Sequence, residues 1–317
     1  MMDIAVVGGG LAGVFAARRL KEAGHRPFII EKSRSVGGRM ATRRMDGGKA
    51  DHGAQFFTAR SEAFKRMVHD WEKQGHVTPW FGEDHPRYRA SFGMNQLVKH
   101  MAEDISVILQ EKIIRVESED FGLTLASEDG ELYTADAAIL TAPVPQTLEM
   151  LERSSLEIET HTSAALAAFH YDPCIAGLFH LKEPQAFGDH GLMDQSLPEG
   201  VAKAAANDQK GISEEPIVTV YMTAEWSKSH FENEDDDILQ ALQAAVSSIW
   251  TSDIHDVQLK KWRYSDALHV HHAPYYQLDS YPLYLAGDAF LYPDDEAGYT
   301  RVESAVLSGL AAAEALL

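Results

Sequence analysis

Near its start the chain runs from an apolar, β-branched stretch directly into glycines, IAVVGGGLAG (residues 4–13). The next residues, VFAARRLKEAG, have helical character up to Gly24, and PFIIE then forms a second short apolar run. This order indicates a strand, a tight turn, a helix and a second strand, which is the opening unit of a doubly wound α/β fold. We therefore expect a Rossmann-like domain here.

The glycines of this turn have the G-x-G-x-x-G spacing, at Gly8, Gly10 and Gly13. The first permits a tight turn, the second lets the backbone approach a pyrophosphate, and the third lets the helix pack on the strand. The helix N-terminus then directs unpaired N–H groups at the phosphates. Glu31 ends the second strand about twenty residues on, where a carboxylate can accept hydrogen bonds from ribose hydroxyls. The pattern predicts dinucleotide binding, and a bare structural turn is the alternative.

A cationic segment, GGRMATRR (37–44), follows in a chain whose formal net charge is -20. Its two glycines allow close backbone approach, and the forked donors of Arg39 and Arg43 can neutralise phosphate oxygens. Arg44 can point the other way and pair with an acidic neighbour. We expect this segment to contact the same dinucleotide, the alternative being a basic surface loop.

The end of the chain completes this pattern. PLYLAGDAF (282–290) predicts a third parallel strand ending in Gly-Asp, so that Asp288 can hold the ribityl or pyrophosphate region of a cofactor. TRVESAVLSGLAAAEALL (300–317) predicts a helix of small residues, whose positive N-terminal end would stabilise negative charge on a reduced flavin ring. Arg301 and Val302 would lie nearest. Together the motifs favour FAD over NAD.

The remaining segments predict a second, substrate-binding domain. We expect helices at 62–75, within 86–103 and at 235–250, short strands across 105–143, strands at 164–171, 175–181, 216–223 and 257–264, and an exposed loop near 199–214. The fold class is therefore α/β (α+β overall), a Rossmann-like FAD-binding domain plus a domain with a mixed or antiparallel sheet. The predicted domains are FAD-binding at 1–60, 105–150 and 278–317, and substrate-binding at 61–104 and 151–277.

The composition excludes several classes of function. Acidic residues outnumber basic ones by 48 to 28, which argues against nucleic acid and anionic membranes as partners. Cys174 is the only cysteine, which excludes an internal disulfide and fits a reducing compartment. No apolar run is long enough to span a membrane, and the N-terminus has no secretory pattern, so we expect a cytoplasmic protein. We predict no metal, since His269, His271 and His272 lack a defined ligand spacing.

These motifs resemble the glutathione-reductase-type FAD fold that amine oxidases share. More specifically, GGRMATRR followed by DHGAQFFTAR (51–60) is similar to renalase and its bacterial homologues. The resemblance recurs at KWRYSDA (261–267) and in YLAGDAF…RVESAVLSGLAAAEAL (284–316). The chain departs from the family where LYPDDEAGYT (291–300) separates the Gly-Asp pair from the last helix. That the short strands across 105–143 form a β-meander of the FAD-binding domain is what the resemblance of the chain to known FAD folds implies.

The resemblance implies an FAD-dependent oxidase of small molecules. Its substrates would be the 2- and 6-dihydro isomers of NAD(P)H, oxidised to NAD(P)+ while O2 is reduced to H2O2. Amine oxidation or carbon–carbon desaturation on the same fold is the first alternative, and a non-redox flavin protein or isomerase is the second. We expect non-covalent FAD, because Cys174 lies outside the C-terminal glycine-rich context in which flavin is anchored.

The candidate site residues follow from the motifs. Gln55 could bond the flavin or the substrate, and Trp262 and Tyr264 share one strand face, suited to stacking on a planar substrate, although a packed core pair is the alternative. We assign these three as catalytic candidates. The predicted cofactor-binding residues are Gly8, Gly10, Leu11, Ala12, Gly13, Glu31, Lys32, Gly38, Arg39, Met40, Ala41, Gln55, Phe56, Gly287, Asp288, Arg301 and Val302.

Overall fold

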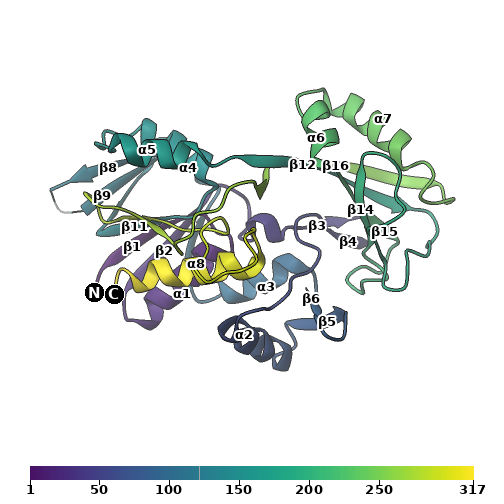
Figure 1. Cartoon of the computed structure of the whole chain (residues 1–317), viewed down its shortest axis with the longest axis horizontal. Helices are drawn as coiled ribbons and strands as arrows, with labels where there is room; N and C mark the ends of the chain where they lie inside the picture. Colours follow the sequence, from purple (N-terminus) through teal and green to yellow (C-terminus); the bar gives the residue numbers. More distant parts are fainter. Residues whose placement is uncertain (121) are drawn as a thin grey trace. The chain divides into compact units, whose positions relative to one another are not determined.

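The computed structural model describes residues 1–120 and 122–317, which form two compact units (Figure 1). Each unit has its own sheets and its own apolar core. The chain passes from one unit to the other four times, so neither unit is a continuous piece of sequence. Unit 1 comprises Met1–Gly38, Val98–His170 and Ala267–Leu317, and unit 2 comprises Arg39–Leu97 and Tyr171–Asp266.

Unit 1 is built on a six-stranded sheet in the order β17-β18-β11-β1-β2-β7. The strands β18, β11, β1, β2 and β7 are parallel, and only the edge strand β17 runs the other way. The predicted Rossmann-like parallel sheet is therefore confirmed. Its strands are β1 (Asp3–Val7), β2 (Arg26–Glu31), β7 (Ser106–Leu109), β11 (Ala137–Leu140), β17 (Tyr276–Leu278) and β18 (Leu283–Leu285).

Two helices, α1 (Leu11–Glu22) and α8 (Val302–Glu314), pack against each other on one side of this sheet (Figure 1). Their small residues and the sheet enclose a core that contains Leu20, Ile139 and Ala312, all fully buried. On the other side lies the antiparallel meander that the sequence predicts. Its strands are β8 (Ile113–Glu119), β9 (Gly122–Ser127) and β10 (Leu132–Ala135), followed by helices α4 (Val144–Glu152) and α5 (Thr160–Ala167).

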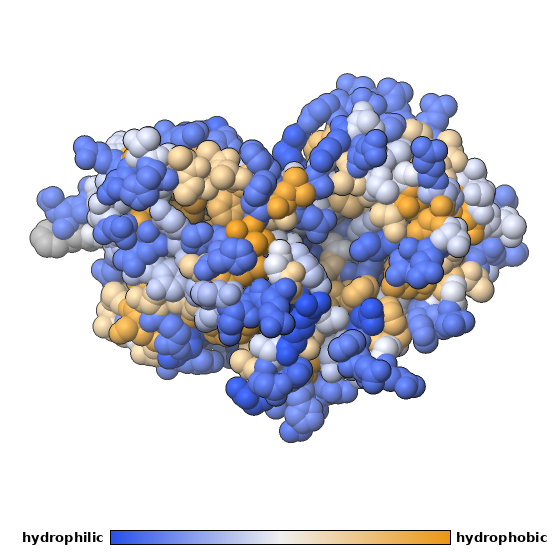
Figure 2. Space-filling model, in the orientation of Figure 1, coloured by the Kyte–Doolittle hydropathy of each residue, from blue (hydrophilic) through white to orange (hydrophobic). Residues whose placement is uncertain are grey.

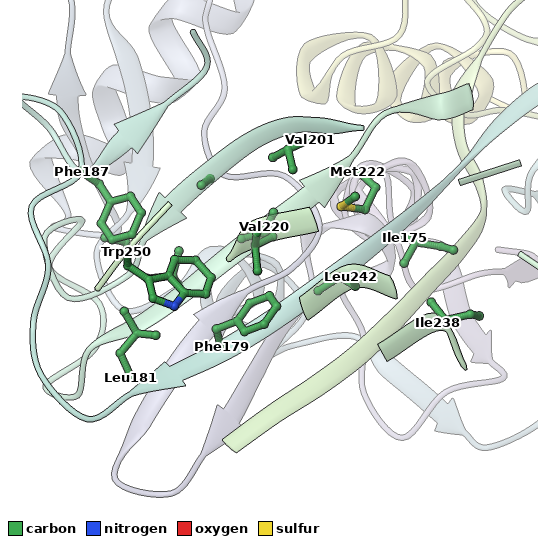
Figure 3. Close-up of a cluster of buried hydrophobic side chains, with 14 of the residues drawn as sticks. Ile175, Phe179, Leu181, Phe187, Val201, Val220, Met222, Ile238, Leu242 and Trp250 are labelled. Atoms are coloured by element: carbon green, nitrogen blue, oxygen red, sulfur yellow. The ribbon is translucent and has the colours of Figure 1, made fainter. Parts of the chain in front are cut away.

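Unit 2 contains a five-stranded sheet in the order β13-β14-β15-β12-β16, with helices α6 and α7 on one face. Figure 3 shows the core between them, where the Phe179 and Trp250 rings lie 4.9 Å apart between centroids and Leu242 of α7 belongs to the same buried cluster. The elements are β12 (Tyr171–Leu181), β13 (Leu192–Met193), β14 (Val201–Ala206), β15 (Ile217–Met222), β16 (Ile254–Ala267), α6 (Ala224–His230) and α7 (Asp235–Val246).

The second face of the same sheet is covered by a hairpin. Met45 and Ala50 of the hairpin are buried against Leu178 of β12 and Ile217 of β15. This packing brings the end of the hairpin, Asp51, against the sheet. The hairpin strands are β3 (Thr42–Met45) and β4 (Gly48–Asp51), and unit 2 further includes the 3-10 turn η1 (Gly38–Met40, shared with unit 1), α2 (Glu62–Lys73), β5 (Val77–Phe81), β6 (Arg87–Ala90) and α3 (Met94–Met101), which contains a boundary between the units.

The visible surface is mainly hydrophilic, as Figure 2 shows, in keeping with the large excess of acidic residues. Within residues 1–120 and 122–317, no helix has both the length and the apolar character needed to cross a bilayer. This agrees with the absence of a long apolar run in the sequence.

Two predictions of local structure are wrong. The stretch 164–171 is not a strand, because α5 covers its first half and β12 begins only at Tyr171. Its alanines have the highest helix propensity, and a short apolar run does not distinguish helix from strand. The loop expected near 199–214 instead contains β14, and both Asn207 and Lys210 are buried. Polar residues suggested exposure there, but their partners come from distant parts of the chain.

The predicted functional domains and the compact units are drawn on different grounds. Residues 39–60, which we predicted to bind FAD, pack within unit 2, because β4 lies against β15. A residue can contact a cofactor from either unit, so the predicted functional division stays a prediction.

Replacing Gly309 by alanine should destabilise unit 1. A Cβ atom at this position would lie 2.1 Å from the carbonyl oxygen of Ala12, so α8 could no longer approach α1. We expect a loss of about 1–3 kcal/mol in the free energy of unfolding, measured by urea denaturation of flavin-free protein. Gly10→Ala is the matched control, because no atom lies within 4 Å of its added Cβ. Equal stability of the two variants would show that the helices do not need this close contact.

Candidate active site

The turn after β1 has a backbone that only glycine fits. Gly8 has φ 109°, a left-handed conformation, and its N–H donates to the carbonyl of Ile30 at 2.9 Å. A Cβ at Gly13 would lie 2.0 Å from the oxygen of Gly8. The glycine spacing therefore sets both the turn and the close approach of α1 to it, as the sequence predicts. Thr141, which follows β11, supports the turn by donating to the oxygens of Val7 and Gly8.

Among the described residues, no side chain caps the N-terminus of α1. Gly10 is its N-cap residue and provides no side-chain cap, and nothing lies within 4 Å of a Cβ at this position. Gly37 donates its N–H to the oxygen of Gly9 at 2.8 Å, and a Cβ at Gly38 would come within 3.3 Å of the Gly10 Cα. The first N–H groups of a helix have no partner inside the helix. This end of α1 can therefore accept an anion at backbone distance.

Glu31 lies beside this turn with its carboxylate buried. One oxygen accepts a hydrogen bond from the N–H of Gly9 at 2.6 Å, and the other accepts from Ser33 at 2.8 Å. Each oxygen keeps one lone pair for a further donor. Glu31 thus stabilises the glycine turn and can still accept from a ribose hydroxyl. The neighbouring Lys32 is exposed and donates to Gln146.

The start of α8 is tied to the end of β18. Ser308 Oγ accepts from the N–H of Gly287 at 2.9 Å, and Ser304 Oγ donates to the oxygen of Asp288 at 2.9 Å. Asp288 and the N-terminus of α8 are therefore fixed relative to each other, and their contact with a cofactor stays a prediction. Val302 opens the helix and is half-buried.

The guanidinium of Arg301 bonds to residues of the acidic segment before α8. It forms an ion pair with Asp295, and its Nη1 donates to the oxygen of Tyr299 at 3.1 Å. The segment 291–300, where the sequence departs from the renalase-like pattern, is thereby folded back on the start of α8. The backbone end of the helix, more than the Arg301 side chain, is left to face a cofactor.

In unit 2, the segments that start from Arg39 and from His52 run side by side. His52 donates its N–H to the oxygen of Ala41 at 3.0 Å, and Ala54 donates to the oxygen of Arg39 at 2.8 Å. A Cβ at Gly53 would lie 1.9 Å from that same Arg39 oxygen. The two motifs of the resemblance, GGRMATRR and DHGAQFFTAR, therefore form one local structure.

Strand β16, which carries the predicted Trp262 and Tyr264, contacts this local structure of residues 39–41 and 52–54. Trp262 donates its indole N–H to the oxygen of His52 at 2.7 Å and stacks on the His52 ring, with centroids 5.4 Å apart. Arg39 donates from Nη1 to the oxygen of Ser265 at 3.0 Å. Trp262 and Tyr264 are both half-buried, and Tyr264 packs edge-on against Tyr171. The predicted shared strand face is present.

The arginines of GGRMATRR do not converge. Arg43 lies exposed on β3 and donates to the side chain of Gln258, whereas Arg39 bonds to Ser265 on the same strand, β16. With a rise of about 3.3 Å per residue, these two contact points are far apart along an extended strand. The prediction that both arginines neutralise one diphosphate does not agree with this geometry, and Arg39 alone stays in the candidate site.

Gln55 is buried, and its amide is held by protein partners. Its nitrogen donates to the backbone oxygen of Asp51 and to the hydroxyl of Tyr221, both at 2.6 Å, and its oxygen accepts from Lys210 at 2.9 Å. Both N–H groups are used, so only one lone pair of the oxygen remains for a ligand.

The apolar candidates are at least partly buried. Phe56 is half-buried against the Trp80 ring. Leu11, Ala12 and Met40 are buried.

His52 was not predicted, although it lies within a quoted motif. The pKa of His52 is lowered to about 4, chiefly by burial and also by the positive charges of Lys260 and Arg43, while the carboxylate of Asp51 acts in the opposite direction. Its imidazole is therefore neutral at physiological pH, and its Nδ1 is buried with no partner in the described part of the chain. Asp51, Lys210 and Tyr221 were missed as well. Their common signal is burial, which the sequence does not show for charged and hydroxyl groups.

Comparisons with known proteins agree with this architecture. Residues 6–71 match an NAD(P)-binding Rossmann-like domain, and residues 72–317, more than half of the chain, match the flavin containing amine oxidoreductases. The chain belongs to the flavin containing amine oxidoreductase family.

Two curated relatives match in part. The flavin-dependent L-tryptophan oxidase of Lentzea aerocolonigenes is 26% identical over 166 residues, which are 49% of this chain and 35% of the relative. A 4,4'-diapophytoene desaturase (4,4'-diaponeurosporene-forming) of Staphylococcus haemolyticus is 50% identical over 52 residues, 16% of this chain and 10% of the relative. The chain thus spans about a third or less of the length of these relatives, which do not single out renalase.

Two solved structures share the whole fold. A protein from Exiguobacterium sp. 255-15, provisionally named a protoporphyrinogen oxidase, superposes with a TM-score of 0.75 at 13% identity, covering 99% of this chain and 98% of that one. A triple mutant of putrescine oxidase superposes with a TM-score of 0.70 at 15% identity and the same coverage. At these identities the likeness supports the fold alone.

Gly10→Ala should lower FAD retention while leaving the protein folded. The added methyl group meets no protein atom but occupies the space through which a diphosphate would approach the N-terminus of α1. We expect purified variant to carry less flavin than the wild type, measured by absorbance of the supernatant after acid precipitation. Full flavin content would place the diphosphate elsewhere, and flavin that stays in the pellet would contradict non-covalent binding.

The pKa of His52 predicts a pH dependence of stability. Its folded pKa, about 4, lies below its ordinary 6.5, so between these values the unfolded state binds more protons and stability falls as pH falls. Relative to His52→Phe, which cannot titrate, the wild type should lose up to about 1.4 kcal/mol per pH unit from pH 6.5 towards pH 4. Urea denaturation at a series of pH values measures this. Parallel curves would show that His52 titrates normally.

Proposed function

We propose that this protein is an FAD-dependent oxidase that removes hydride from a carbon bonded to nitrogen, with O2 as the final electron acceptor. The observation that carries the proposal is the Gly8–Gly13 turn with Glu31 beside it, in a chain of the flavin containing amine oxidoreductase family. Amines are the substrate class that the comparisons favour, since an amino-acid oxidase is among the relatives.

Unit 1 would hold most of the cofactor. The open N-terminus of α1 at Gly10 suits the diphosphate, and the free lone pairs of Glu31 suit a ribose. Asp288 would hold the ribityl region, and the N-terminus of α8 would stabilise negative charge on the ring. When bound, FAD takes up the hydride and passes the two electrons on to O2.

The reaction balances without a protein nucleophile. A primary amine with a hydrogen on its α-carbon loses hydride from that carbon and a proton from nitrogen to become an imine, while O2 becomes H2O2. The amine must be unprotonated when the hydride leaves, since a protonated nitrogen has no lone pair to form the carbon–nitrogen double bond. The chain's own contribution is to orient the substrate and exclude water, for which Trp262 and Tyr264 are the candidates.

Isomeric dihydronicotinamide dinucleotides are the second candidate substrates. The 2- and 6-carbons of their ring are also bonded to nitrogen, so hydride loss likewise creates a carbon–nitrogen double bond, now within an aromatic cation. Here the second hydrogen of H2O2 comes from solvent, and no proton leaves the substrate. The paired GGRMATRR and DHGAQFFTAR segments, which resemble renalase, support this candidate.

We further propose that FAD is bound non-covalently. Cys174 is the only cysteine, and the pKa of its thiol is raised to about 12, chiefly by burial and also by the nearby negative charge of Asp266. The thiolate that a thioether linkage requires is therefore scarce at neutral pH. Release of flavin into the supernatant by acid, as above, tests this.

Anaerobic mixing separates the substrate classes. Loss of the flavin absorbance should follow addition of small primary amines or amino acids, with a rate at low substrate that rises about tenfold per pH unit up to the pKa of the amine. Bleaching by 2- or 6-dihydronicotinamide dinucleotides alone, without this pH dependence, would select the second candidate. Bleaching by polyenes alone would indicate a desaturase, and flavin that none of these reduces would indicate a non-redox flavin protein.

A further inference from the structure

Unit 2 contains a charged pair with no access to solvent. Lys210 Nζ lies 2.6 Å from Asp51 Oδ2, and both side chains are 0% exposed. Lys210 comes from the turn after β14, and Asp51 from the end of β4. Removing two charges from water costs several kcal/mol per ion, and a buried ion pair is often no more stabilising than apolar residues of similar volume. Stability alone therefore does not account for this pair.

Hydrogen bonds from several parts of unit 2 hold one segment, the end of β4 at Asp51. Asp51 Oδ1 accepts from the N–H of Met94 at 2.9 Å and from the hydroxyl of Thr42. The backbone N–H of Asp51 donates to Asn207 Oδ1 at 3.0 Å, and its oxygen accepts from Thr219 Oγ1 at 2.8 Å. The end of β4 is thus fixed by side chains from both β15 and the turn that carries Lys210.

The same contacts continue into Gln55. Lys210 donates to the amide oxygen of Gln55 at 2.9 Å, and Tyr221 accepts from its amide nitrogen at 2.6 Å. Tyr221 in turn donates to the oxygen of Gly53 at 2.7 Å. The polar groups that bond to the amide therefore belong to one connected network, in which Lys210 and Asp51 supply the charges.

The fixed segment carries the local structure of the candidate site. Residues 52–54 pair with the backbone of Arg39 and Ala41, and the His52 oxygen accepts from Trp262. A shift at Asp51 would therefore move His52 and Trp262 as well as Gln55.

We propose that Lys210 and Asp51 are positioning residues, which fix residues 51–55, and Gln55 above all, in the geometry that the oxidase reaction requires. The claim about geometry stands on the contacts of unit 2, and only its consequence for catalysis rests on the proposed function. Neither residue is assigned a contact with substrate or cofactor.

The test replaces the pair by neutral residues of similar shape, Asp51→Asn with Lys210→Met. Lys210→Met alone would leave a buried, unpaired carboxylate and can prevent folding, whereas the double variant removes both charges and keeps an acceptor at position 51. In flavin-free protein, we expect amide hydrogen exchange in residues 51–57 to accelerate by about tenfold or more, while β15 keeps its protection. Lys182→Met, which breaks the exposed pair with Asp253, is the matched control and should change neither the exchange of residues 51–57 nor that of β15.

Activity is then read with whichever substrate bleaches the wild type. The double variant should reduce flavin about tenfold more slowly or worse, and Gln55→Met should cost as much in the wild type but little more in the double variant, because the pair acts through Gln55. Unchanged exchange in residues 51–57, additive effects of Gln55→Met, or a double variant that does not fold would each overturn the proposal. If no substrate is found, the proposed function fails while the exchange measurement still decides the positioning claim.

Discussion

The close contact between the turn after β1 and helix α1 is the constraint on which the rest depends. With 2.0 Å between the Gly8 oxygen and a Cβ built at Gly13, any side chain there would push the helix away from the sheet. The same contact directs the N-terminus of α1 over the carboxyl end of β1. Gly309 of α8 makes a similar contact, since α8 also approaches the α1 backbone at a position without a side chain. The absence of a side chain at Gly13 and at Gly309 thus allows both helices that border the predicted nucleotide site to pack closely.

The parts of the fold that the sequence predicted are those coded locally. The run from Ile4 to Glu31 contains its own strand, turn and helix signals, and β18 with α8 likewise combines an apolar run with a small-residue helix. The α5 segment was misread because its alanines suit more than one structure. Lys210 was placed in an exposed loop because its partners, Asp51 and Gln55, lie more than 150 residues earlier in the chain. No local pattern records such a pairing.

The candidate site shows the same division. The glycines, Glu31 and Trp262 could be chosen from motifs, because each is defined by its neighbours in sequence. The loss of Arg43 from the site and the enclosure of the Gln55 amide could not, because their partners, Gln258 and Tyr221, lie far away in the sequence. The pairing of Arg301 with Asp295 is local, but it depends on the fold of a segment that has no recognisable pattern. Motifs identify the residues of a site more readily than they identify which of their atoms are free.

The discontinuity of unit 1 has a consequence for how the molecule assembles. β2 pairs with β7 and β11 pairs with β18, and each pairing closes over a long insertion, residues 39–97 in the first case and residues 171–266 in the second. Closing long loops is entropically unfavourable and slows the formation of such contacts. If each insertion becomes compact early, its ends are held nearer to each other and the parallel sheet closes more readily. Compact insertions in unit 2 thus lower the entropic cost of closing the sheet of unit 1.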